Sequence, residues 1–198
     1  MRRILAVVAL VVFAAGCSGG GSADDASTPT RASNPAAFAS SKFAACPAPT
    51  GQVPGDSPLR DVEPLLCMSE TRDMMTIGAP TGRPMVLNLW ATWCPPCGQE
   101  MPSFVRLANQ AGDRLTVVGI NTSDDASRAV AAADELDVRF ANVYDRAEEV
   151  RKALGINALP ATAFVSATGE VVHIHRGTPL TDASLASLVR QYLGVTVE

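Results

Sequence analysis

Two cysteines separated by two residues, Cys94 and Cys97, lie in the stretch WATWCPPC at residues 90–97. Such a pair could bind a metal, brace the fold as a disulfide, or exchange electrons with another thiol or disulfide. Structural zinc sites usually need four ligands, typically from two CxxC or CxxH pairs. The two histidines, His173 and His175, alternate along one face of an expected strand and are predicted to be solvated there. We therefore predict no metal site.

The position of the pair favours electron exchange over a purely structural bridge, which stays as the alternative. A short apolar run at 84–90 predicts a buried strand, and a helix is expected from about Cys94 to Gln110. A helix N-terminus places positive potential and free amides beside the first sulfur, which stabilises a thiolate. A CxxC disulfide also closes a tight ring that is more reducible than a long-range bridge. We predict that Cys94 attacks and that Cys97 resolves the mixed disulfide.

The rest of the chain alternates between strand and helix patterns. Further strands are expected at the end of VEPLLC (62–67), at 114–121 and at 139–145; further helices at 123–136, 147–154 and 182–193; and a hairpin at 161–177. Strands alternating with helices, closed by a hairpin and a helix, indicate a layered α/β domain.

The N-terminal end resembles an export signal. Arg2 and Arg3 precede an apolar run at 4–15, which is too short to cross a bilayer of about 30 Å as a helix. Small residues before Cys17 resemble a bacterial lipobox, in which that cysteine carries a lipid; the alternative is an ordinary signal with a chance cysteine. We expect a lipoprotein signal peptide at 1–16 and a chain anchored by lipid on the extracytoplasmic face of the bacterial membrane.

Residues 17–45 are rich in Gly, Ser, Ala, Asp and Pro, and this composition predicts a flexible membrane tether. Residues 46–198 remain for one domain with a proper core. The net charge of −4 is mild and basic residues do not cluster, so no nucleic-acid partner is expected. The tether and the modest charge suit a monomer.

The chain has five cysteines, and a lipid on Cys17 would leave two pairs. The second pair, Cys46 and Cys67, would close a loop of about twenty residues, worth about 3 kcal/mol in the chain-entropy model. We predict a structural disulfide that pins an N-terminal extension at 46–67 to the domain. A second redox centre is the alternative, although this pair lacks CxxC spacing.

The stretch VLNLWATWCPPCGQEMP resembles the thioredoxin superfamily, and specifically the TlpA/ResA/CcmG-like exported thiol-disulfide oxidoreductases, from about residue 68 to the C-terminus. The resemblance implies a thioredoxin-like fold, in which a central mixed β-sheet is flanked by helices and 123–145 forms the family's extra helix and strand. Trp93 precedes the first cysteine, and Pro102 falls where the family kinks its helix. GINALPATAFV resembles the loop with the family's cis-proline. A cis Leu159–Pro160 bond beside Cys94 is thereby implied, in a loop that pairs with the bound client.

Two details of this stretch bear on mechanism. Thioredoxin has a buried aspartate six residues before its first cysteine, whereas this chain has Asn88, which cannot take a proton. In ResA-like proteins a glutamate three residues after the second cysteine handles the proton, which implies that role for Glu100; a surface or cap glutamate is the alternative. Because Pro95 and Pro96 lack N–H groups, only the Cys97 amide remains to stabilise the Cys94 thiolate, which favours a reductase over an oxidant.

The resemblance implies an enzyme without a cofactor that reduces disulfides in client proteins, with apocytochrome c as one such client. An integral membrane thiol donor would return the electrons. The alternative with the same chemistry is a disulfide-forming oxidant of exported proteins. A thiol peroxidase would need Pro and Thr where this chain has Leu87 and Ala91. A copper-binding or client-binding lipoprotein is the remaining alternative, although copper carriers of this fold use wider cysteine spacing and a distal histidine.

Overall fold

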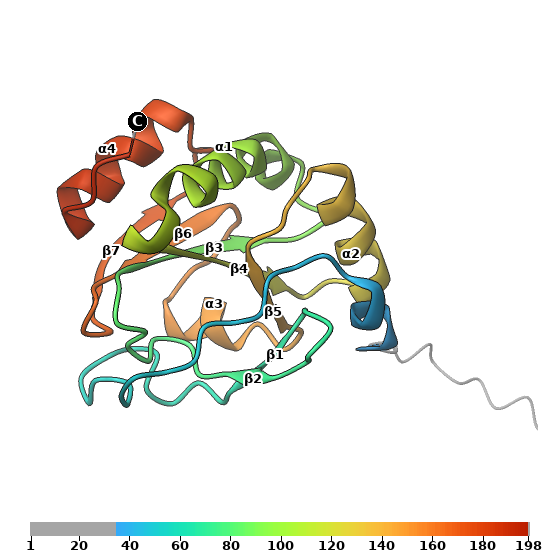
Figure 1. Ribbon diagram of the computed structural model, residues 1–198, viewed down its shortest axis with the longest axis horizontal. Helices are drawn as coiled ribbons and strands as arrows, with labels where there is room; N and C mark the ends of the chain where they lie inside the picture. Colours follow the sequence, from blue (N-terminus) through green and yellow to red (C-terminus); the bar gives the residue numbers. More distant parts are fainter. Residues whose placement is uncertain (1–34, 198) are drawn as a thin grey trace, which may run out of the picture. The chain divides into compact units, whose positions relative to one another are not determined.

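Seven strands form one mixed sheet in the computed structural model, which describes residues 35–197 (Figure 1). Their order across the sheet is β2-β1-β5-β4-β3-β6-β7. The central strands β3, β4 and β5 run parallel, whereas β6 and β1 join them antiparallel. The strands are β1 (Leu65–Cys67), β2 (Met74–Met75), β3 (Met85–Trp90), β4 (Thr116–Thr122), β5 (Ala141–Asp145), β6 (Ala161–Val165) and β7 (Val171–Arg176).

Helices cover both faces of the sheet (Figure 1). Alternate residues of β3 divide between the two faces, as in any strand: Val86 and Trp90 pack with α1, α2 and α4, and Leu87 and Leu89 pack with α3. The helices are α1 (Pro95–Ala111), α2 (Ala126–Glu135), α3 (Glu149–Ala153) and α4 (Asp182–Leu193), with short 3-10 turns η1 (Pro35–Ser40) and η2 (Gly112–Arg114). The predicted α/β fold is confirmed, and the ends of the predicted elements differ by a few residues.

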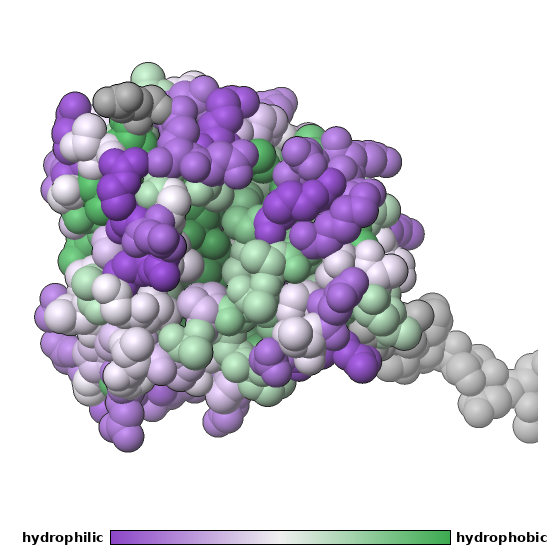
Figure 2. All heavy atoms as spheres, viewed as in Figure 1, coloured by the Kyte–Doolittle hydropathy of each residue, from purple (hydrophilic) through white to green (hydrophobic). Residues whose placement is uncertain are grey.

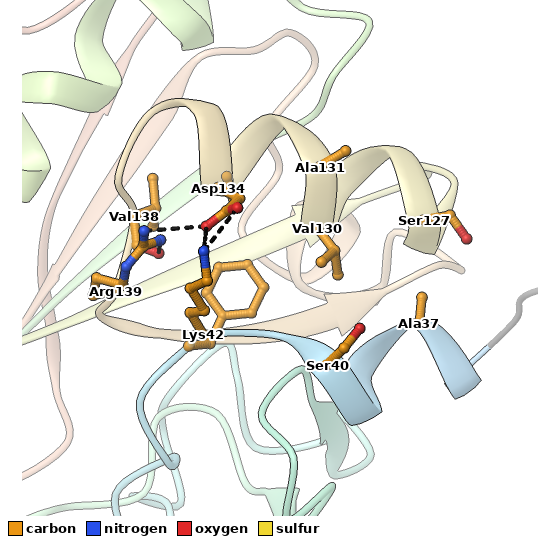
Figure 3. A pocket seen from close by; sticks show the side chains of 11 residues that line it. Ala37, Ser40, Lys42, Ser127, Val130, Ala131, Asp134, Val138 and Arg139 are labelled. Atoms are coloured by element: carbon orange, nitrogen blue, oxygen red, sulfur yellow. Dashed lines mark hydrogen bonds and ion pairs between the residues drawn. The ribbon is translucent and has the colours of Figure 1, made fainter.

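Part of the segment before residue 46 packs on the domain, although the sequence predicts that residues 17–45 form a tether. Phe38 is fully buried, Phe43 is almost so, and the Phe38 ring lies edge-on to Tyr144 at 5.6 Å between centroids. Lys42 forms an ion pair with Asp134 of α2, beside Arg139, along a groove between η1 and α2 (Figure 3). Together with hydrogen bonds from Ser41 to Met68 O and from the Ala44 N–H to Arg139 O, these buried side chains hold the described part of this segment on the domain.

The Cys46–Cys67 disulfide predicted from the sequence is present, with 6.0 Å between the two Cα atoms. It joins the extension to β1, where Cys67 is fully buried. The extension then crosses the α3 side of the sheet and packs Leu59 and Val62 into the core there.

The predicted signal peptide, Cys17 and the first half of the tether lie outside the described residues. Within residues 35–197, no helix combines the length and the apolar character needed to cross a membrane. The face shown in Figure 2 has hydrophilic residues along its rim and hydrophobic residues in a central recess.

Candidate active site

Cys94 and Cys97 lie at the N-terminus of α1, directly after the loop that leaves β3, and they form a disulfide. Cys94 is the N-cap residue, and the backbone N–H of Cys97 donates a hydrogen bond to Cys94 Sγ at 3.3 Å. Cys97 is fully buried, whereas Cys94 keeps 6% of its surface exposed. Cys94 is thus slightly more accessible than Cys97.

Pro95 and Pro96 occupy the first two positions of α1. A helix N-terminus normally offers several free amides, but proline has no N–H to donate. The Cys97 amide is therefore the donor that this helix end supplies to Cys94 Sγ, as the sequence predicted.

The Leu159–Pro160 peptide bond is cis, which confirms the prediction from the resemblance. Pro160 directly precedes β6, whose first residue Ala161 pairs with Leu89 near the end of β3. The cis-proline loop, which leads into β6, and the segment between β3 and α1 therefore lie at the same end of these two strands. Direct packing of Pro160 against Cys94 stays a prediction.

The two tryptophans that flank the loop have opposite environments. Trp90 is buried at the end of β3 and donates its Nε1–H to Asn142 Oδ1 at 2.9 Å. This amide sits directly over Gly119 of β4, where an added Cβ would lie 1.9 Å from Asn142 Oδ1, so only glycine fits there. Trp93 leaves 53% of its surface exposed beside Cys94 and donates its Nε1–H to Ser123 O at 2.9 Å.

Glu100 lies on the second turn of α1 and is buried, with 1% of its surface exposed, and it is therefore not a surface or cap glutamate. Asn88 Nδ2 donates to its Oε1 at 2.7 Å, and the Leu180 N–H donates to its Oε2 at 2.9 Å. Burial raises the pKa of Glu100 to about 7, although the hydrogen bonds from Leu180 and Asn88 act in the opposite direction. A carboxyl group that can gain or lose a proton near neutral pH thus lies one helical turn after Cys97.

The structure joins Asn88 and Glu100, which the sequence had singled out for separate reasons. The two residues are 12 positions apart and belong to different elements, β3 and α1. No local pattern predicts this hydrogen bond, because it depends on how α1 packs across the sheet.

The β4–α2 loop contributes a residue that the sequence pattern places only at the start of the helix expected at 123–136. Asp124 is buried and accepts hydrogen bonds from both the N–H and the hydroxyl of Thr92, two residues before Cys94. The neighbouring Asp125 is the actual N-cap of α2. The available sequence signal is an acidic residue shortly after the strand expected at 114–121.

Both histidines lie on β7. His173 stacks on Tyr192 of α4 with 4.0 Å between ring centroids, and His175 Nε2 contacts Thr178 O at 2.8 Å. Both are half-buried rather than fully solvated. Across residues 35–197, no group of three or more His, Cys, Asp or Glu side chains is placed to hold a metal ion.

Comparisons with known proteins agree with this geometry. The family described as Redoxin matches residues 52–190. Thiol-disulfide oxidoreductase ResA of Halalkalibacterium halodurans is 31% identical over 97 residues, which cover 48% of this chain and 55% of ResA. Thiol:disulfide interchange protein DsbE of Yersinia pestis is 36% identical over 97 residues, which cover 48% of this chain and 50% of DsbE. The chain thus spans about half the length of these curated relatives.

Among solved structures, MTB DsbF in mixed oxidized and reduced forms superposes with a TM-score of 0.60 and 25% identity, covering 71% of this chain and 99% of DsbF. The predicted thioredoxin-like fold and the resemblance to TlpA/ResA/CcmG-like proteins are confirmed.

Proposed function

This chain belongs to the Redoxin family, and from that membership and the placement of its CxxC pair we propose that it is a thiol-disulfide oxidoreductase. In the reduced protein, the Cys94 thiolate attacks one sulfur of a client disulfide, and the other client sulfur leaves as a thiolate. Cys97 then attacks Cys94 Sγ and releases the first client sulfur. Two electrons pass to the client, and the protein is left with the Cys94–Cys97 disulfide seen here. The chemistry needs no cofactor, because the cysteines hold the electrons.

Glu100 is proposed to take the proton from the Cys97 thiol as that residue attacks. Its burial beside the first turn of α1 and its pKa of about 7 suit a group that exchanges a proton at neutral pH. Asn88 and the Leu180 amide orient the carboxyl group from two other elements.

The direction of electron flow is proposed to be reduction of client disulfides, of the cytochrome c maturation type. Because the two prolines after Cys94 have no N–H, the Cys97 amide is the hydrogen-bond donor that this helix end supplies to Cys94 Sγ. The reduced form is therefore less stabilised than the reduced form of a pair at an amide-rich helix end. A less stabilised dithiol has a lower reduction potential and gives up electrons more readily.

The client is proposed to bind across Trp93 and the cis-proline loop at Leu159 and Pro160. Trp93 exposes a large apolar surface beside the reactive sulfur, and such surface marks a contact site. The loop that contains the cis Leu159–Pro160 bond, before β6 begins, is proposed to offer its backbone groups to an extended client segment.

Cellular placement follows from the sequence and remains part of the proposal. A signal peptide at 1–16, a lipid on Cys17 and a tether would hold the domain, as a monomer, at the extracytoplasmic face of the membrane. An integral membrane thiol donor would then re-reduce the Cys94–Cys97 disulfide.

The observation that carries the proposal is Cys94 as the N-cap of α1 with its sulfur on the Cys97 amide. Its test is the reduction potential of this couple, obtained by equilibrating the purified chain in thiol buffers and quantifying each form by alkylation. A potential around −270 mV, near that of thioredoxin, would support the reductase. A potential around −120 mV, near that of DsbA, would replace it with a disulfide-forming oxidant.

A further inference from the structure

Asp124, in the loop between β4 and α2, is a buried carboxylate with 3% of its surface exposed. Its Oδ2 accepts hydrogen bonds from the Thr92 N–H at 2.6 Å and from Asn121 Nδ2 at 2.9 Å. Its Oδ1 accepts from the Thr92 hydroxyl at 2.6 Å and from the Asp125 N–H at 2.8 Å. Four neutral donors thus converge on two oxygens, an arrangement that a carboxylate satisfies and an amide side chain, with one oxygen, cannot.

Two of these four donors belong to the loop that carries the reactive cysteine. Thr92 lies between the end of β3 and Cys94, and both its backbone and its side chain are held by Asp124. A third hydrogen bond links the same two loops, because Trp93 Nε1 donates to Ser123 O. Ser123 has a φ of 49°, a left-handed backbone that few residues other than glycine adopt. The β4–α2 loop is therefore shaped to grip the segment before Cys94.

We propose that Asp124 is a positioning residue for the Cys94–Cys97 couple. The proposal rests on the thiol-disulfide activity proposed above. In the oxidised protein, the disulfide itself keeps Cys94 next to Cys97. In the reduced protein that bond is gone, and the grip of Asp124 on Thr92 keeps Cys94 at the helix end, with its sulfur on the Cys97 amide. Asp124 therefore stabilises the reduced form more than the oxidised form and keeps the Cys94 thiolate reactive.

Charge and position make opposite predictions for the loss of this carboxylate. A negative charge near a thiolate disfavours it, so a purely electrostatic role means that Asp124→Asn makes Cys94 more reactive. A positioning role means the reverse, because an amide leaves two of the four donors without an acceptor and releases the loop. Slower reaction of Cys94 in Asp124→Asn therefore indicates a positioning role, and faster reaction indicates an electrostatic role. A general loss of stability does not slow the reaction of Cys94.

The experiment compares the reduced full-length chain with its Asp124→Asn variant at one fixed pH. Iodoacetamide labels Cys94, and peptide mass spectrometry gives the rate; equilibration with glutathione gives the ratio of dithiol to disulfide. We expect the labelling rate to fall about tenfold and the equilibrium to shift about tenfold toward the disulfide, since hydrogen bonds to a charged group are strong. Asp125→Asn is the matched control: it removes one carboxylate from the same loop, keeps a good N-cap, and should stay within about twofold of wild type.

A second variant, Thr92→Val, removes one donor and keeps the other. It should shift both readouts in the same direction by about threefold, and the double variant should resemble Asp124→Asn alone because the two residues share one interaction. Asp124→Asn that folds, by circular dichroism, and labels as fast as wild type or faster would overturn the proposal. If Asp124→Asn does not fold, Thr92→Val decides, and wild-type behaviour of that variant would overturn it.

These readouts use the reactivity of Cys94 and need no client. The wild-type chain is assayed separately for reduction of a disulfide-bonded peptide, and a lack of turnover there counts against the proposed function. The labelling comparison still decides the role of Asp124.

Discussion

Both cysteine pairs, Cys46–Cys67 and Cys94–Cys97, form disulfides in this structure, but their structural surroundings differ. The first pair spans 21 positions and ties an irregular extension to a strand. The second spans three positions at a helix end, between an exposed tryptophan and a buried, titratable glutamate. In the chain-entropy model the long loop is worth about 3 kcal/mol and the short ring about 2 kcal/mol. The surroundings, more than the bond, indicate which disulfide braces the fold and which reacts.

The largest expected effect is the loss of turnover in Cys97→Ala. Cys94 can still attack a client disulfide in this variant, but no thiol remains to resolve the mixed disulfide. Turnover should fall to background, and a covalent complex with the client should accumulate and be visible by mass spectrometry. The matched change at the other bridge, Cys46→Ala with Cys67→Ala, should leave turnover nearly intact. Residual turnover in Cys97→Ala above a few per cent would show that Cys97 is not the resolving group.

The second prediction concerns stability, for which Cys46–Cys67 should matter more than Cys94–Cys97. Cys46→Ala with Cys67→Ala should lower the free energy of unfolding by about 3 kcal/mol, because the unfolded chain regains the freedom of the long loop. Denaturant unfolding of the oxidised protein checks this. Cys94→Ala with Cys97→Ala is the control and should cost less. The assignment of a bracing role would be wrong if the control lost more stability than the first variant.

The third prediction concerns Glu100 and pH. Its pKa rises from 4.5 to about 7 on folding because burial disfavours the charged form. The folded state therefore holds a proton that the unfolded chain has released between these values, and stability falls as pH rises through this window. The full difference is about 3 kcal/mol, present below pH 4.5 and lost above pH 7.

Glu100→Gln tests this directly, because glutamine has no proton to lose in the window. The free energies of unfolding of the two proteins should coincide at pH 4, where Glu100 is neutral, if the glutamine packs as well as the neutral glutamate, and they should separate as the pH rises to 8. The decisive quantity is thus the slope: wild type should lose about 3 kcal/mol more than Glu100→Gln across the window. Glu170→Gln, at an exposed glutamate, is the control and should keep the wild-type slope. Equal slopes in wild type and Glu100→Gln would contradict the assignment.

The smallest expected effect is that of Pro96→Ala. Alanine at this second helical position restores an N–H close to Cys94 Sγ, which should stabilise the thiolate and raise the reduction potential by about 30 mV, a tenfold change in the equilibrium. Thiol-buffer titration measures it. Asn109→Ala, at an exposed site far along α1, is a control for helix propensity. A potential that stays the same or falls would remove the argument that the prolines favour a reductase.

Local patterns predicted most of the fold. The apolar run at 84–90 located β3, and the patterns at 114–121 and 182–193 located β4 and α4, because such signals lie within a single element. The cis Leu159–Pro160 bond was reached only through the family resemblance. The two-residue strand β2 was missed, since so short a pairing leaves no periodicity to detect.

Contacts between distant segments could not be predicted in the same way. Phe38 and Phe43 were placed in a tether because the polar composition around them outweighed two isolated aromatic residues. The hydrogen bonds of Asp124 to Thr92 span 32 positions and depend on two strand ends meeting at one edge of the sheet. The CxxC pair is thus evident from the sequence, whereas the hydrogen bonds around its loop are visible only in three dimensions.

The placement of Trp90 and Trp93 has a spectroscopic consequence. They are the two tryptophans of the chain, and both lie within four positions of Cys94. One indole is buried in the core and the other faces solvent. Because disulfides quench nearby indole fluorescence, the protein carries an intrinsic optical reporter of its own redox state. Phenylalanine at position 93 would leave a single buried emitter, so the signal from the core could be read apart from that of the surface.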